Sequence, residues 1–453
     1  MYDYVYFSAK HTTMKLYNAL KLRFDEPLWA LTPELALFDT ILEQKPELIR
    51  LFEKDVRKGL KNNNLGRKDS PTVEQIVRAA IFKEIKQLDY RELEISMYDS
   101  NSFKLFMNLD GRIPFSFSVL QKYISKISKE SLTKAIVEIN KIAIVENIET
   151  VESISTDTTS IKTNVHYPTN NSLVWDCIKT ATRLLEKIQK ERKDDDELRK
   201  LEERRIIAKR LNYQINNTKK EDQKTLFDPY LSILQDIMVD MENMIKTQRT
   251  GSNIKKIIDL SQITKKVYAN AFRFQIEGKK VETSEKIFSI FEQHTDILVK
   301  GQREVEFGHK VLITRGKSNL ILDFEIEEGN PSDSNLFIPT IDRLIADYTI
   351  IPKNVSNDGG FASAANLAWA KLRWIKNIVF TKITKSMKNI VESAEVELLL
   401  KKWRGSTEAV ISNLKRGFGL QRVEWSGWEG FKSKVAWGIL GYNLRVMCNR
   451  MLT

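Results

Sequence analysis

Cysteine and histidine are both scarce in this sequence. Of its 453 residues, two are cysteine (Cys177 and Cys448) and four are histidine. Two distant cysteines cannot supply a disulfide framework or a cysteine-based zinc site, and no two histidines stand four residues apart, the spacing that places a pair on one helical face. The sequence therefore argues against a disulfide-stapled fold and against a zinc enzyme.

Long apolar runs are also missing. No stretch approaches the roughly 18 to 20 residues that span a bilayer, and the opening MYDYVYFSAKHTT lacks the basic-then-apolar order of a signal peptide. We therefore expect a soluble intracellular protein that does not span a membrane.

A phosphate-binding loop of the nucleotide-binding type is absent as well. The nearest candidate, Gly301 to Lys310, has six residues between its glycines and carries His309 before the lysine, which fails the required spacing. We therefore expect no nucleotide cofactor.

Hydrophobic residues and positive charge are plentiful. The chain is 42% hydrophobic and 9% aromatic, enough to build cores in roughly two to four compact units. Its 72 Lys and Arg outnumber 60 Asp and Glu, which gives a net charge of +12. Such an excess favours a polyanionic partner, and charge alone does not choose between nucleic acid and an anionic membrane surface.

The N-terminal third has the period of helices. From about 32 to 147, apolar residues recur at helical spacing between segments rich in glycine, proline and serine. We predict one helical domain over residues 1–147. Its basic parts are KDVRKGLKNNNLGRK and the face around Lys122 and Lys126, and they either contact phosphate groups or form a solvated surface.

The pattern changes in the next segment. VESISTDTTSIKTN, at 151–164, has the composition of a strand and carries Asp157, whereas residues 173–297 are helical in pattern almost without a break. Two further strands follow at 304–330, joined by a predicted turn at Arg315-Gly316-Lys317-Ser318. A single strand ahead of a long helical block has no sheet to join, so we predict one mixed α/β domain over 148–453, interrupted by a helical insertion at about 173–297.

A late helix has one charged face. In RGSTEAVISNLKRGFGL, the side chains of Arg404, Glu408 and Lys415 fall within about 40° of one another, whereas Val410 and Leu414 point away. One glutamate therefore lies between two cations on the same side of the helix.

Three carboxylates are candidates for chemistry. Asp157 lies inside a strand, where burial of a carboxylate is costly. Asp358 follows a short strand and precedes two glycines, which allow a close backbone approach. With Glu408 they come from three separate elements. Carboxylates that converge in this way bind hard divalent cations such as Mg²⁺ or Mn²⁺, and a pair of such ions catalyses phosphoryl transfer.

Each carboxylate also has a purely structural explanation. The Asp358 segment forms a turn on its own, Asp157 can bond to neighbouring threonines, and Glu408 can pair with Arg404 along its helix. Asp323 and Asp347 compete for the same roles, and spacing alone does not exclude them.

The glutamate helix resembles that of bacterial insertion-sequence transposases of the DDE type, whose signature is Y-x2-R-x3-E-x6-K. Arg404, Glu408 and Lys415 match the last three positions in register, and Lys401 stands where the family has tyrosine. The resemblance extends to DTTSIKTNVHYPTNNSLVWD, GQREVEFGHKVLI and NDGGF, and to the N-terminal DYRELEISMYDSNSFKLFMNLDGRIPFSFSVLQKYISKI.

This resemblance implies a fold and a site. The fold is RNase H-like, with Asp157 on the first strand, Asp358 after the fourth, Glu408 on a late helix, and the helical block inserted between the first and second strands. The resemblance implies two Mg²⁺ or Mn²⁺ ions, both bridged by Asp157, with Asp358 and Glu408 completing one site each. It also assigns DNA phosphate contacts to Arg404 and Lys415.

The resemblance likewise implies an activity and partners. A transposase of this type cleaves DNA at transposon ends and transfers the free 3′-hydroxyl into target DNA. Its partners are the double-stranded DNA of the ends and the target, and a second copy of the chain in the DNA complex. The setting is the cytoplasm of a prokaryote, in association with DNA.

Two alternatives share this fold. One is a DNA-binding protein that has lost catalysis, and the other is a metal-dependent nuclease that cuts DNA without joining it to a target. The presence of all three carboxylates favours an active protein, but their presence in the sequence does not establish their geometry.

Overall fold

The chain forms two compact units. The structure is a computed structural model that describes residues 32–58, 70–109, 111, 113–247, 250–299, 305–383 and 387–452. One unit comprises Met1–Lys162 together with Leu298–Thr453, and the other comprises Thr163–Ile297. The N-terminal helices and the sheet thus share a unit, and the division into domains at residue 147 stays a prediction. The basic segment from residue 59 to 68 and the glycine at 301 lie outside the described residues.

The first unit begins with helices. They are α2 (Pro33–Gln44), α3 (Glu47–Arg57), α4 (Val73–Lys86), α5 (Tyr90–Asp99), α6 (Asn101–Phe106), α7 (Phe117–Ile124) and α8 (Lys129–Val145). Helices α4 and α5 start with capping boxes, in which Thr72 and Asp89 exchange hydrogen bonds with the residue three positions later. The predicted helical character of this region is therefore confirmed.

A mixed sheet follows. Its strands are β1 (Ser153–Thr163), β2 (Asp296–Leu298), β3 (Glu306–Arg315), β4 (Ile321–Glu327), β5 (Asn354–Asn357), β6 (Asn377–Phe380) and β7 (Arg422–Val423). The order is β2-β3-β1-β5-β6, with β4 also paired to β3 and β7 to β1. Strands β3 and β4 form the predicted antiparallel hairpin.

Strand β1 is the centre of this sheet. It runs antiparallel to β3, where Asp157 stands opposite Ile313, and parallel to β5. A helical block separates β1 from β2 in the chain. The prediction of an RNase H-like mixed sheet with a long helical insertion after the first strand is confirmed.

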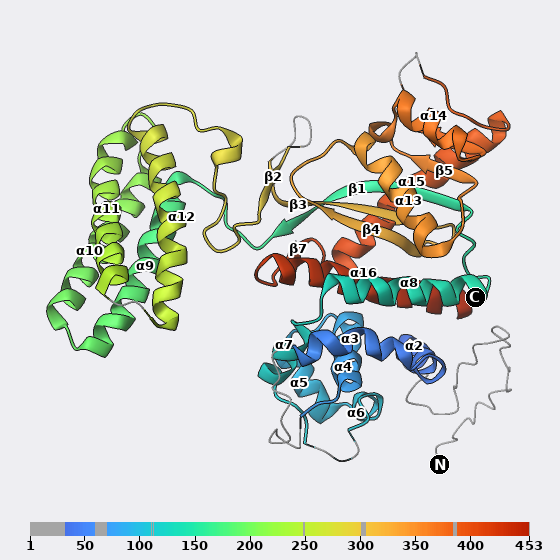
Figure 1. Cartoon of the computed structure of the whole chain (residues 1–453), viewed down its shortest axis with the longest axis horizontal. Coiled ribbons are helices and arrows are strands. Elements are labelled where there is room, and N and C mark those ends of the chain that lie inside the picture. Colours follow the sequence, from blue (N-terminus) through green and yellow to red (C-terminus); the bar gives the residue numbers. More distant parts are fainter. Residues whose placement is uncertain are drawn as a thin grey trace, which may run out of the picture. The chain divides into compact units, whose positions relative to one another are not determined.

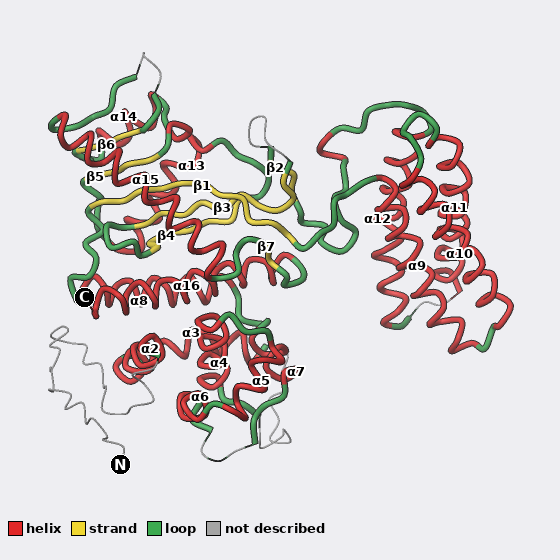
Figure 2. The backbone as a smooth tube through the Cα atoms, turned by 180° about the vertical axis from the view of Figure 1, so that it is seen from behind, coloured by secondary structure: helices red, strands yellow, loops and turns green. Residues whose placement is uncertain are grey.

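The remaining helices follow the sheet strands. They are α13 (Asp333–Tyr348), α14 (Ala364–Leu372), α15 (Ala394–Gly417) and α16 (Trp428–Leu452). Helix α15 packs against β5 and β6, and α16 packs against β4 and against α2, α4 and α8. Figures 1 and 2 show α8 and α16 side by side between the sheet and the first helices. The last helix of the chain thus joins the N-terminal helices to the sheet.

A buried polar network fastens α8 and α16 to the sheet. Asn140 and Asn443 both donate to the carbonyl oxygen of Ile321, at 2.9 and 2.8 Å, and Asn443 also accepts from the Ile321 N–H. The Tyr348 hydroxyl completes the group at 2.9 Å from Asn140. Because every member is buried and bonded, the network specifies one alignment of these elements.

The second unit is a bundle of long helices. They are α9 (Asn170–Arg192), α10 (Asp195–Asn217), α11 (Gln223–Thr247) and α12 (Ser252–Gln275). Their apolar faces form a core separate from that of the first unit. The helical pattern was predicted to continue to about residue 297, but α12 ends at Gln275. Gly278, at φ +70°, takes a left-handed conformation that does not continue a helix. None of the described helices is long and apolar enough to cross a membrane.

A buried carboxylate holds the N-terminal helices to α16. Glu84 of α4 is 2% exposed and pairs with Lys434 of α16 and, at 3.5 Å, with Lys83. The two lysine side chains are 10% and 9% exposed. One carboxylate is therefore the shared counter-charge of two buried lysines.

Replacement of Glu84 by alanine should lower the free energy of unfolding by about 3–5 kcal/mol, because it leaves buried cations without their counter-charge. Urea denaturation measures the change. The control is Glu429→Ala, because the Glu429 side chain is 71% exposed in a surface pair with Lys432 and its loss should cost less than about 1 kcal/mol. Equal effects of the two substitutions would contradict this role for Glu84.

Candidate active site

Asp157 lies in the middle of β1, the central strand. Its side chain is 16% exposed, and its Oδ1 accepts a hydrogen bond from its neighbour's N–H, that of Thr158, at 2.8 Å. Strand β3 pairs with β1 through the backbone at Asp157, and β5 pairs with β1 at Ser153 and Ile154, shortly before it. The sheet therefore sets the position of the Asp157 Cα.

Asp358 follows the last residue of β5. The side chain of Asn357 accepts a hydrogen bond from the Thr156 N–H at 2.8 Å, which fastens the end of β5 to β1. Thr381 donates to Asp358 Oδ1 at 3.0 Å. The next residue has to be glycine, because a Cβ on Gly359 would lie 2.1 Å from the carbonyl oxygen of Lys382. The sequence prediction of a close backbone approach after Asp358 is consistent with this contact.

Glu408 projects from α15 at the rim of the same region. Its neighbour Thr407 faces inward and is fully buried, where its hydroxyl shares a hydrogen bond of 2.9 Å with Ser155 of β1. Ser356 of β5 donates to the carbonyl oxygen of Leu400, which lies earlier in α15 than Thr407, at 2.8 Å. These two bonds fix α15 across the strands that carry Asp157 and Asp358, while Glu408 itself stays 72% exposed.

Sequence reasoning missed a residue that anchors this helix. Arg315, at the end of β3, is fully buried and donates to Thr407 Oγ1 at 2.9 Å and to the carbonyl oxygen of Trp403 at 2.6 Å. Its guanidinium also lies 4.4 Å from the centre of the Trp403 ring. Burial lowers the pKa of Arg315 to about 10, which leaves it charged at neutral pH. The available signal was an arginine that ends the otherwise apolar run VLITR.

Arg404 contacts all three carboxylates. Its Nη2 lies 2.9 Å from Asp157 Oδ2 and 3.8 Å from Asp358 Oδ1, and its Nη1 lies 3.6 Å from Glu408 Oε1. The two aspartate oxygens share one nitrogen, so they are at most about 7 Å apart, a separation that a pair of metal ions roughly 4 Å apart can bridge. The three predicted carboxylates therefore meet around one guanidinium.

The electrostatics of Asp157 reflect this crowding. Burial raises its pKa, and the nearby charge of Asp358 raises it further. The positive charge of Arg404 and the hydrogen bond from Thr158 act in the opposite direction without cancelling the rise. A proton or another cation at this point is therefore favoured.

The donor set fits a hard divalent cation, because carboxylate oxygens are the ligands that Mg²⁺ and Mn²⁺ prefer. As the side chains stand, no three of the described histidines, cysteines, aspartates and glutamates lie close enough together to hold a metal ion. Arg404 lies among the carboxylates instead, and its Nε is buried with no hydrogen-bond partner in the described part of the chain. The predicted metal ligands are together, and they are held by an arginine.

Lys415 lies farther along α15. It is eleven residues beyond Arg404, about 16 Å along the helix axis, and so stands outside the carboxylate cluster. Lys415 lies close enough to Glu306, at the start of β3, for its charge to act on that carboxylate. Partial burial raises the pKa of Glu306, but the hydrogen bond from Ser160 and the charges of Lys162 and Lys415 lower it below its usual range.

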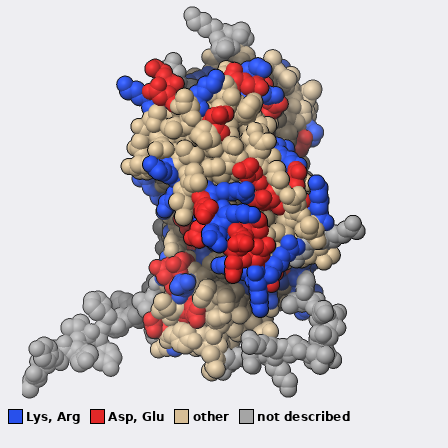
Figure 3. All heavy atoms as spheres, turned by 90° about the vertical axis from the view of Figure 1, so that its left-hand side faces the viewer, with Lys and Arg blue, Asp and Glu red and all other residues tan. Residues whose placement is uncertain are grey.

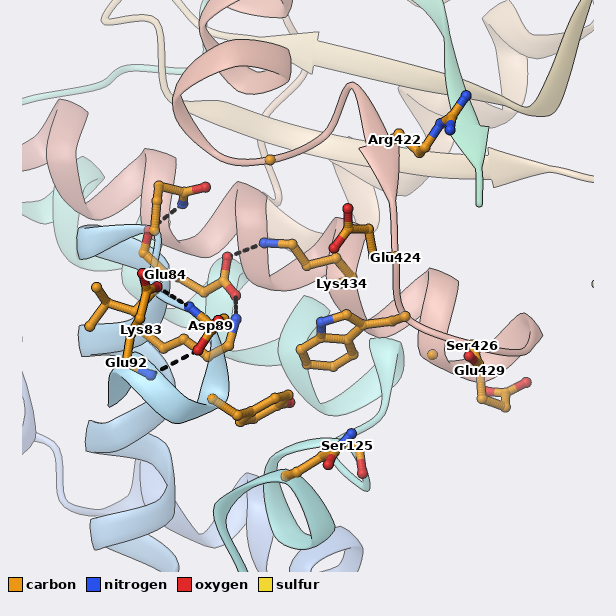
Figure 4. Close-up of a pocket in the computed structure, with 17 residues that line it drawn as sticks. Lys83, Glu84, Asp89, Glu92, Ser125, Arg422, Glu424, Ser426, Glu429 and Lys434 are labelled. Carbon is orange, nitrogen blue, oxygen red and sulfur yellow. Dashed lines mark hydrogen bonds and ion pairs between the residues drawn. The ribbon is translucent and has the colours of Figure 1, made fainter. Parts of the chain in front are cut away.

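A separate cavity lies between α4, α5, α7 and the start of α16. Its volume is about 810 Å³, and none of the five predicted site residues lines it. Figure 4 shows that charged residues of its lining already bond to one another. Glu84 pairs with Lys434, and at the start of α5 the Glu92 carboxylate accepts a hydrogen bond from the Asp89 backbone N–H. The same contacts hold the helices together, so we assign this cavity a structural role.

Replacement of Asp157 by asparagine should raise the free energy of unfolding at neutral pH. Because the pKa of Asp157 is raised on folding, the ionised carboxylate opposes folding above that raised pKa, and the opposition disappears below the ordinary aspartate pKa of about 3.9. Urea denaturation at several pH values should therefore show a gain that vanishes as the pH falls.

The exposed acid Glu429 provides the control for this experiment. Glu429→Gln should change the free energy of unfolding by less than about 0.5 kcal/mol at any of these pH values. A variant with asparagine at position 157 that is less stable than the natural protein at neutral pH would contradict the prediction.

Comparison with known proteins gives one match. A family model described as the transposase DDE domain matches residues 297–444, about a third of the chain. No curated protein and no solved structure matches the chain. The matched segment includes Asp358, Arg404, Glu408 and Lys415, whereas Asp157 precedes it on the other side of the helical insertion. Asp157 is thus connected to the other residues by the tertiary contacts described above.

Transposase DDE domains act in the DNA cleavage and transfer of transposition, they are generally catalytic, and they typically use divalent metal ions. Over residues 297–444, this chain is similar to the transposase DDE domain.

Proposed function

We propose that this protein is a transposase that cleaves DNA at the ends of a mobile element and joins the freed 3′-hydroxyl to target DNA. The observation that carries the proposal is the contact of a single guanidinium, that of Arg404, with Asp157, Asp358 and Glu408. These three side chains come from the central strand, the end of its parallel neighbour and a late helix. Three acids gathered from such distant positions are costly to fold and are best explained by function.

Asp157, Asp358 and Glu408 would together hold the two divalent ions of this proposal. When bound, such ions activate the attacking hydroxyl and stabilise the leaving oxygen in phosphoryl transfer. The protein provides the fixed acids. Asp157 and Asp358 are held by hydrogen bonds from Thr158 and Thr381, and the more exposed Glu408 is free to adjust its side chain.

Arg404 has two successive roles in this proposal. In the absence of metal it supplies the positive charge that the three carboxylates require. With metal ions held at the acids, the Arg404 guanidinium would be available to bind a DNA phosphate. Lys415, farther along the same helix, binds a second phosphate. Arg404 and Lys415 would thus hold the DNA backbone along α15, next to the three acids.

Replacement of any one of Asp157, Asp358 and Glu408 by alanine should reduce DNA cleavage by on the order of 1,000-fold. Each substitution removes one of three proposed metal ligands that act together. The assay uses Mn²⁺ or Mg²⁺ and duplex DNA that carries the ends of the protein's own element. Nicked and joined products are measured separately. DNA binding should be nearly unchanged.

The matched control is Asp347→Asn. Asp347 is a half-buried acid on α13 that competed with Asp358 in the sequence analysis, and its replacement should leave cleavage within about twofold. Cleavage that survives loss of Asp157 would overturn the site. Nicks without joined products would identify a nuclease, and binding without any product would identify an inactive relative.

Replacement of Lys415 by alanine should weaken DNA binding and reduce the slope of log affinity against log salt by about 0.9, the contribution of one phosphate contact. Fluorescence anisotropy at several salt concentrations measures the slope. Lys415→Arg keeps the charge and should keep the slope. An unchanged slope in the alanine variant would leave Lys415 as a surface residue that balances Glu306.

A further inference from the structure

The helical bundle takes no part in the proposed chemistry, and its helix α10 exposes large apolar side chains on one face. On α10, Ile206 is 60% exposed and Tyr213 is 71% exposed. The opposite side of the helix is buried in the bundle through Leu201, Ala208 and Ile215. The outer side therefore presents apolar groups that the bundle itself does not need.

These groups belong to a continuous face, here called the α10 stripe. All its members are exposed, and at 100° per residue all lie within about 60° of Ile206. The members are Arg199, Glu202, Glu203, Ile206, Lys209, Arg210 and Tyr213. Acids thus precede the central isoleucine, and bases follow it.

This arrangement is complementary to itself. If two copies of α10 pack antiparallel about a twofold axis at Ile206, Glu202 of one copy faces Lys209 of the other and Glu203 faces Arg210. At the ends of the stripe Arg199 meets the ring of Tyr213, a favourable cation–aromatic pair. A parallel arrangement would instead place each acid against the same acid. Charge therefore selects the antiparallel pairing.

We propose that the α10 stripe is a contact surface between two copies of this chain, related by a twofold axis at Ile206. Each contact occurs twice, as a closed dimer requires. The existing pairs of stripe residues, Arg199 with Asp196 at 3.2 Å and Glu202 with Arg205 at 3.9 Å, are exposed and cost little to rearrange.

The stripe is better suited to a second copy than to nucleic acid. It carries three cations against two acids, which is too even a balance for a polyanion. Figure 3 shows acidic and basic side chains interspersed on the face of the molecule that it draws. The stripe extends for about 21 Å along the helix, shorter than most stable interfaces require, so we expect a dimer with a dissociation constant in the micromolar range.

Charge reversal tests the proposal in three steps. Sedimentation of the full chain should show a dimer that forms with increasing concentration. The all-basic variant Glu202→Lys/Glu203→Arg and the all-acidic variant Lys209→Glu/Arg210→Glu should each dimerise at least about 100-fold more weakly, because like charges then face each other. A one-to-one mixture of the two variants should recover the dimer, since every pair is then attractive.

The control variant carries the charge change of the all-acidic variant elsewhere on the bundle. Lys255→Glu/Lys256→Glu alters two exposed lysines of α12 and should dimerise like the natural protein. Circular dichroism verifies that each variant is folded. A natural protein that stays monomeric at about 100 µM, or variants that dimerise normally, would overturn the proposal. So would stripe variants that stay dimeric and lose DNA binding instead.

The proposal does not depend on catalysis. Alanine at position 157 should leave the dimer unchanged, so failure of the dimer test and failure of the cleavage test are separate results.

Discussion

The mutual repulsion of three carboxylates is the constraint on which this structure depends. Asp157, Asp358 and Glu408 converge from three elements, and their negative charges cannot lie together without a cation. In the structure Arg404 is that cation, at 2.9 to 3.8 Å from each of the three. The site is therefore built around positive charge, and the same electrostatic demand that holds the arginine also favours divalent ions.

The surrounding scaffold offsets this repulsion with hydrogen bonds that do not involve the acids. Arg315 and Ser155 both bond to Thr407, the residue before Glu408, and Asn357, the residue before Asp358, bonds to Thr156. In both places a buried neighbour fixes the backbone while the acid beside it faces the site. These scaffold hydrogen bonds thus position the acids without neutralising their charge, as a binding site for cations requires.

Much of the fold was predictable because it depends on local patterns. Three signals were each contained in a stretch of about 20 residues or fewer. They are the β-branched residues around Asp157, the hairpin that begins with β3 and the helical period of the insertion. Two features were not predictable in this way. The helices of the insertion end at Gln275 rather than near residue 297, and Arg315 was interpreted as part of a turn although it is buried against α15.

The sequence by itself determined the element types and the interrupted α/β order, because propensity and periodicity are properties of neighbouring residues. The three acids were predicted from the resemblance to DDE-type transposases, because spacing alone did not exclude other acids. Only the tertiary structure decided that Asp157 lies beside residues two hundred positions away, because β1 pairs with β5 across the insertion. It also decided the direction of Arg404. A helical wheel places that side chain beside Glu408, but only the packing of α15 across the sheet turns it onto all three acids.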